Sequence, residues 1–84
     1  MATPMSELFV VAHRFLGRLD SSDEVHTTRL AADAEAIAQE TAWALMYERS
    51  YGRPPAVPSH EVLSLDEYIR LREEQVRATE EAKR

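Results

Sequence analysis

From Asp23 to Tyr51 the chain holds no proline or glycine, and this stretch limits the possible folds more than any other. Ser21 and Glu24 just before it have the spacing of a capping box, which marks the start of a helix. Gly52 follows directly, with two prolines close behind, the usual order of a left-handed cap and a helix stop. The sequence therefore predicts one long helix over about 22–51.

At 100° per residue, this helix has two apolar sides. The predicted core side carries Leu30, Ala34, Ile37, Ala38, Thr41 and Leu45. The second side carries Ala36, Trp43, Tyr47 and Tyr51. A helix of about 29 residues is about 43 Å long, which is more than a domain with a radius of gyration of ~12 Å needs. We therefore expect part of the helix to be left for a partner.

Residues 5–19 are predicted to form an amphipathic helix. The residues that share its apolar side are Met5, Leu8, Phe9, Ala12, Phe15, Leu16 and Leu19. Leu8 to Val11 could instead be a buried strand, because short apolar runs fit either structure. No second β-rich run is found to pair with such a strand, so the helix is favoured. A short polar turn then predicts an antiparallel hairpin of helices 5–19 and 22–51.

The segment 52–63 holds three prolines and is predicted to be an extended, stiff linker. Ser64 and Glu67 repeat the capping-box spacing, and Leu63 and Tyr68 are placed to form a hydrophobic staple across it. This predicts a third helix over about 65–80. The predicted fold class is therefore all-α: a single three-helix domain over 1–84, made of a helical hairpin and a third helix after the Pro-rich linker.

Composition narrows the function classes. The chain has 84 residues and no cysteine, which excludes disulfides and thiolate metal sites. No signal-like start and no apolar run near 18 residues is seen, so we expect a cytoplasmic protein that does not bind membranes. The formal charge is −5, and most of it falls in residues 1–52. An acidic surface disfavours non-specific nucleic-acid binding, which needs cations to replace the counterions of the phosphates.

Residues suited to catalysis are few. His13, His26 and His60 lie in different predicted elements, without an acidic or histidine partner at metal-ligand spacing, so each is predicted to be structural or exposed. The chain has only two glycines, which leaves no phosphate-cradling loop and no tight turn for a nucleophile. We therefore expect no catalytic residue, no metal and no cofactor, and no enzymatic activity.

The aromatic side of the long helix is the most informative feature for function, because aromatic residues are enriched at interface hot spots. We assign partner binding to Trp43, Tyr47 and Tyr51, with Glu40 and Ala36 beside them. The alternative is that the third helix covers this side as core. The resulting hypothesis is a small, non-enzymatic protein-interaction module, a homodimer through the long central helix, that acts as an adaptor or inhibitor of another protein.

Two other functions stay open. One is a small transcription-associated or antitoxin-type regulator, which the acidic first half disfavours. The other is a small all-helical enzyme with a site shared between subunits, built for example from Arg14, Arg72 and Glu40, although no motif supports it.

Overall fold

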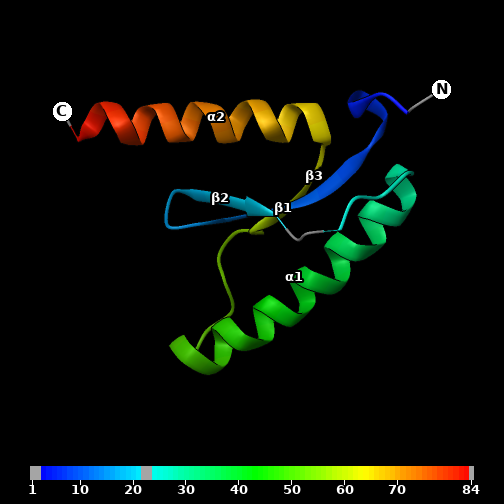
Figure 1. Cartoon of the computed structure of the whole chain (residues 1–84). Coiled ribbons are helices and arrows are strands. Elements are labelled where there is room, and N and C mark those ends of the chain that lie inside the picture. The colour runs from blue at the N-terminus through cyan, green and yellow to red at the C-terminus, as the bar shows by residue number, and fades with distance from the viewer. Residues whose placement is uncertain (1–2, 22–23, 84) are drawn as a thin grey trace.

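The computed structural model of the chain describes residues 3–21 and 24–83. Its elements in chain order are η1 (Met5–Glu7), β1 (Phe9–Phe15), β2 (Arg18–Ser21), α1 (Arg29–Tyr51), β3 (His60–Ser64) and α2 (Leu65–Ala82). The strands form one antiparallel sheet in the order β2-β1-β3, with α1 on one face and α2 on the other (Figure 1). This is an α+β fold, so the prediction of an all-α three-helix domain is wrong.

Strand β1 is the centre of the sheet and occupies the middle of the segment predicted as helix 5–19. A two-residue turn joins β1 to β2: Leu16 and Gly17 have φ of 53° and 77°, and Phe15 pairs with Arg18. Two positive φ values are the pattern of a type I′ hairpin turn. The prediction of a helix was wrong because the two strands that pair with β1 could not be recognised. Both β2 and β3 are edge strands with mostly polar residues, so neither has an apolar pattern that indicates a strand. The predicted helical hairpin fails with it, and the strand alternative at Leu8 to Val11 is the better description.

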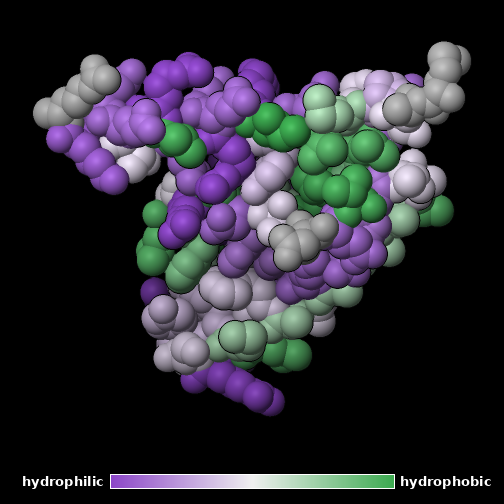
Figure 2. Space-filling view, in the orientation of Figure 1, coloured by the Kyte–Doolittle hydropathy of each residue, from purple (hydrophilic) through white to green (hydrophobic). Residues whose placement is uncertain are grey.

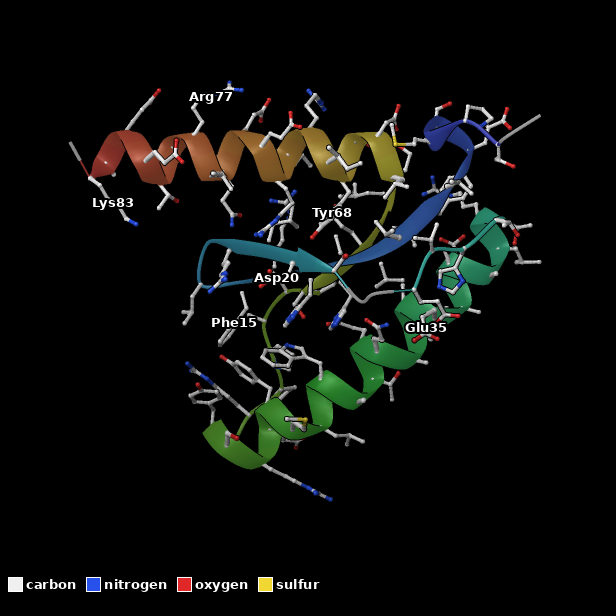
Figure 3. All side chains as sticks on the ribbon, in the orientation of Figure 1. Phe15, Asp20, Glu35, Tyr68, Arg77 and Lys83 are labelled. Carbon is white, nitrogen blue, oxygen red and sulfur yellow. The ribbon has the colours of Figure 1, made fainter. Side chains whose placement is uncertain are left out.

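The two faces of the sheet follow from the alternation of side chains along β1. Ala12 lies on the α2 side in a buried cluster with Leu19 and Leu63, and α2 covers the cluster with Tyr68 and Leu71. Figure 3 shows Tyr68 on the sheet side of α2 and Arg77 on the opposite side. His13 and Phe15 alternate with Ala12 along β1 and therefore lie on the opposite face of the sheet, which α1 covers.

Helix α1 begins later than predicted and ends where predicted. Thr28 is its N-cap, and the Thr28 hydroxyl accepts a hydrogen bond from the Ala31 amide at 3.2 Å. Residues before it are held extended, because the backbone of His26 bridges that of Phe9. Residues 22–23, where the start was predicted, lie outside the described residues. Gly52 has φ of 75° and caps the end, which confirms the predicted stop.

Helix α2 starts at the predicted place by a different contact. Ser64 is its N-cap but makes no capping bond to the helix backbone. The Ser64 hydroxyl donates to Asp66 at 2.6 Å, and the same carboxylate oxygen accepts the Glu67 amide at 2.8 Å. The helix continues to Ala82, slightly past the predicted end. The predicted linker 52–63 is too long, because its last four residues belong to β3.

Side chains of the helices also form hydrogen bonds with backbone groups of both outer strands. On β2, the Leu19 amide donates to Gln75 Oε1 at 2.8 Å, and Arg72 donates to the Leu19 carbonyl at 2.8 Å. On β3, the His60 amide donates to Glu40 at 3.0 Å. Backbone groups of outer strands are the usual template for strand addition, and at Leu19 and His60 helix side chains bind them.

Only a small core holds this arrangement together. The buried hydrophobic residues among those described are Val10, Val11, Ala12, Leu19, Ala32 and Leu63. The radius of gyration is 14.6 Å, against ~12 Å for a compact domain of this length. In Figure 1 the two helices diverge from each other toward the hairpin end of the sheet. The chain therefore leaves much of its apolar surface uncovered.

Candidate functional site

Helix α1 presents two different sides, and these decide where a functional site can lie. We define its inner face as Ala36, Glu40, Trp43 and Tyr47. We define its outer face as Leu30, Ala34, Ile37, Ala38, Thr41 and Leu45. The inner-face residues are partly buried: Trp43 contacts β1, and Glu40 contacts β3. All six outer-face residues are exposed.

The aromatic part of the inner face packs on β1. The Trp43 ring meets the rings of His13 at 4.7 Å and Phe15 at 4.9 Å, both edge-on, as measured between ring centroids. Tyr47 lies 6.1 Å from Trp43, and Tyr51 lies 4.5 Å from Tyr47. The alternative in which the third helix covers this stripe is therefore wrong, because β1 covers Trp43.

A groove of about 390 Å³ opens beside these rings. Phe15, Trp43 and Tyr47 form its aromatic wall, and Val57 and Pro58 from the segment before β3 form the other side. Leu16 at the hairpin tip also lines it and is 89% exposed. The groove joins the aromatic stripe to the solvent, so the stripe is only partly enclosed.

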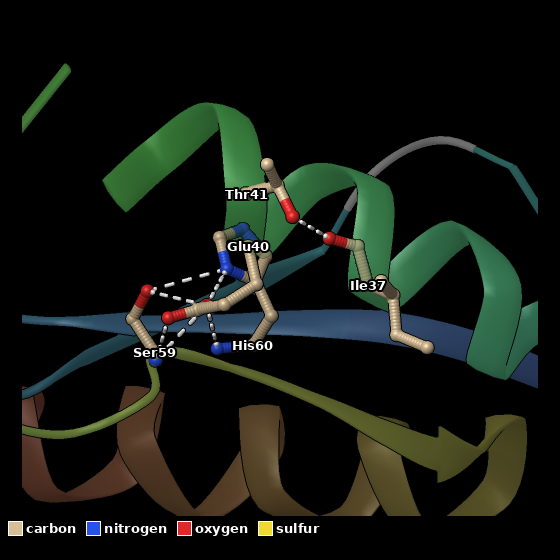
Figure 4. Close-up of polar contacts among 5 residues, drawn as sticks. All are labelled: Ile37, Glu40, Thr41, Ser59 and His60. Carbon is tan, nitrogen blue, oxygen red and sulfur yellow. Dashed lines mark hydrogen bonds and ion pairs between the residues drawn. The ribbon is translucent and has the colours of Figure 1, made fainter. Parts of the chain in front are cut away.

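The polar part of the inner face is a cluster built around the Glu40 carboxylate (Figure 4). It accepts the amides of Ser59 and His60 at 3.1 and 3.0 Å, and the Ser59 hydroxyl at 3.2 Å. Nδ1 of His60 lies 2.5 Å from the same carboxylate. One side chain of α1 thus fixes the point at which the chain enters β3.

Electrostatics in this cluster reflect burial and hydrogen bonding. Burial by itself would raise the pKa of Glu40, but the hydrogen bonds from His60 and Ser59 outweigh it and lower that pKa. Burial lowers the pKa of His13, and His60 lowers it further against the opposing charges of Glu40 and Asp20. Nε2 of His13 is buried and has no hydrogen-bond partner among the described residues. Neutral His13 and ionised Glu40 are the forms that the fold favours.

A histidine paired with a carboxylate can act as a general base, but it must then reach a substrate. The His60 side chain is 7% exposed, and its ring stacks on His13 with 4.5 Å between centroids and 4° between planes. The carboxylate already accepts four donor groups. The described residues contain no group of three or more His, Asp or Glu side chains placed to hold a metal ion. The arrangement is best suited to joining α1 to the sheet.

The outer face of α1 is apolar and turned away from the rest of the chain. Leu30 is 81% exposed, Ile37 69% and Leu45 58%, so the prediction that this stripe is core is wrong. It is wrong because both sides of the helix are apolar, and the sheet packs on the aromatic one. In Figure 2 green and pale-green residues follow the edge of the molecule along α1, at the lower right.

The structure places the residues predicted to bind a partner mostly against the chain itself. Glu40 and Trp43 contact the sheet side, Ala36 and Tyr47 are half-buried, and Tyr51 is 61% exposed. Their assignment to a partner stays a prediction. The three residues suggested for an enzyme site do not come together. Arg14 pairs with Glu61, and Arg72 contacts Leu19 and Asp20. Both arginines lie on the opposite side of the sheet from Glu40.

Sequence reasoning missed two features: the cluster of Glu40, Ser59, His60 and His13, and the exposure of the outer face. The first needs the register of β1 with β3, in which His13 pairs with His60. Residues 60–63 give no clear local signal of this strand, because polar His60 and Glu61 precede two apolar residues and the alternation of a half-buried strand is missing.

No known protein family, curated protein or solved structure matches this chain. Within the part of the chain that the structure describes, neither helix is long and apolar enough to span a lipid bilayer.

Proposed function

We propose that this protein is a small, non-enzymatic protein-binding module whose contact surface is the outer face of α1. The observation that carries the proposal is the uncharged, apolar outer face itself. Monomeric soluble proteins rarely expose a contiguous apolar patch of this kind unless it binds something. A domain of this size that covers part of a partner's surface would act as an adaptor or as an inhibitor.

The small core supports the same reading. A chain of 84 residues buries little more than half of its unfolded surface, and such domains often depend on association for stability. Covering Leu30, Ile37 and Leu45 would roughly add another small core to the one that the chain makes alone. The inner face cannot serve as well, because Glu40 and Trp43 already have partners within the chain.

The test is a pair of matched substitutions. Ile37→Glu places a charge at the middle of the outer face, and Val57→Glu makes the same kind of change at an equally exposed residue outside α1. We expect both variants to keep the helical circular dichroism of the wild type, since both side chains are exposed. Binding to proteins of the source cell, read by affinity capture and mass spectrometry, should be lost only in Ile37→Glu. Equal binding by all three proteins would contradict the proposal.

A further inference from the structure

The outer face of α1 has the same residue spacing when it is read from either end, and a leucine stands at each end. Read from the N-terminus it runs Leu30, Ala34, Ile37, Ala38, Thr41 and Leu45, with a leucine at each end and mainly small residues between. We infer that its partner is a second copy of this chain, whose α1 lies antiparallel across it. This inference rests on the proposed function and names the partner of the same surface.

An antiparallel pair centred between Ile37 and Ala38 matches the two copies throughout. Leu30 then lies opposite Leu45 of the other copy, Ala34 opposite Thr41, and Ile37 opposite Ala38. Each contact occurs twice, as a two-fold interface requires. At the centre the large Ile37 packs against the small Ala38 of the other copy, and the small Ala34 and Thr41 lie next to this pair, so the two helices can pack within the usual 8–10 Å between axes.

Charges favour the antiparallel orientation over a parallel one. No charged residue lies on the outer face between Leu30 and Leu45. At its borders stand Asp33, which pairs with its own Arg29 at 3.9 Å, and Glu48 beyond the end of the face. In a parallel pair, each of these carboxylates would lie beside the same carboxylate of the other copy, and the like charges would repel. In the antiparallel pair Asp33 lies opposite an alanine instead. Antiparallel helices also oppose their macrodipoles favourably.

The size of the face sets the expected affinity. Fifteen steps from Leu30 to Leu45 make about 22 Å of helix at ~1.5 Å per residue. Such a strip involves fewer residues than the roughly 20–30 a side of a standard stable interface. A weak, reversible dimer with a micromolar dissociation constant fits this area.

Sedimentation equilibrium of the full chain tests self-association. We expect a monomer–dimer equilibrium in the micromolar range for the wild type and for Val57→Glu. Ile37→Glu brings two carboxylates to the centre of the pair and should weaken the dimer by about thirtyfold or more, the effect of losing one interface hot spot. Circular dichroism must show that Ile37→Glu stays folded. An unfolded variant would mean that the outer face belongs to the fold and would overturn the inference.

Orientation can be tested cleanly, because the chain has no cysteine of its own. With a short thiol-specific cross-linker, Ala38→Cys should cross-link to itself, since it lies next to the two-fold axis. Leu30→Cys should cross-link to Leu45→Cys when the two are mixed, and not to itself. Self-linking of Leu30→Cys without the mixed product would show a parallel pair and overturn the inference.

Failure of this inference and failure of the proposed function give different results. A wild type that stays monomeric at high micromolar concentration rules out the second copy. If Ile37→Glu then still loses a captured cellular protein that Val57→Glu retains, the outer face binds a different protein and the proposed function stands. If it loses nothing, both are wrong.

Discussion

Replacing Glu40 with alanine should strongly destabilise the fold, because it removes the acceptor shared by four donor groups. These are the amide and the hydroxyl of Ser59, and the amide and Nδ1 of His60. A hydrogen bond to a charged group contributes ~1.5–3 kcal/mol. Because the Glu40 side chain is 26% exposed, water replaces part of what is lost. We therefore expect a total loss of about 3 kcal/mol, well below the sum over four bonds.

A loss of that size is easy to measure in a domain this small. One kcal/mol shifts the unfolding temperature by about 4–8 °C at 60–100 residues, so Glu40→Ala should melt roughly 10–25 °C below the wild type. Circular dichroism at pH 7 gives the melting curve. The protein concentration should be low enough to keep the chain monomeric, because association raises the midpoint.

Glu61→Ala is the matched control, since it makes the same substitution on β3, next to the Glu40 partner His60. Glu61 pairs with Arg14 at 2.6 Å, but their side chains are 43% and 56% exposed. Exposed ion pairs contribute at most about 1 kcal/mol. If Glu40→Ala melts within about 4 °C of Glu61→Ala, the carboxylate does not hold α1 to the sheet, and our description of the inner face is refuted.

Two further predictions concern β1 and its turn. Since the folded chain holds the pKa of His13 below 6.5, the unfolded chain takes up the proton first, so the stability present above pH 6.5 should fall as the pH drops below it. His13→Phe keeps a ring in place and should reduce that fall in urea titrations between pH 8 and 5; an unchanged profile would mean that another group titrates. Leu16→Asn should raise stability by about 1 kcal/mol, because asparagine tolerates the φ of 53° better than leucine and the side chain is 89% exposed. A lower urea midpoint for this variant would show that Leu16 makes stabilising contacts in the groove.

Local signals predicted the end of α1 and the start of α2. Gly52 needs only its own backbone freedom to stop α1, and Ser64 with Asp66 starts α2 from within one turn. The start of α1 was missed because Ser21 fits the pattern of a cap as well as Thr28 does. The pairing of Ser21 with Ala12 in the sheet and the backbone bridge between Phe9 and His26 exclude the earlier start.

Long-range pairing could not be predicted in the same way. β1 is one short apolar run, and the strands beside it, β2 and β3, are short and mostly polar. The side of α1 that packs was also undecidable, because Leu30, Ile37 and Leu45 are as apolar as the aromatic stripe. The sheet decides this through His13 and Phe15, whose rings receive Trp43. The cluster around Glu40 depends on the same pairing.

The helix side chains that bind the two edges of the sheet have a consequence for aggregation. Arg72 and Gln75 of α2 occupy the Leu19 backbone, and Glu40 of α1 occupies the His60 amide. A further strand can pair with the backbone at these two residues only after the helix side chain has released its hydrogen bond. Fibre formation should therefore begin from local detachment of a helix, while most of the molecule is still native. Conditions that loosen α2 without melting the sheet are where a concentrated solution of this protein would first turn cloudy.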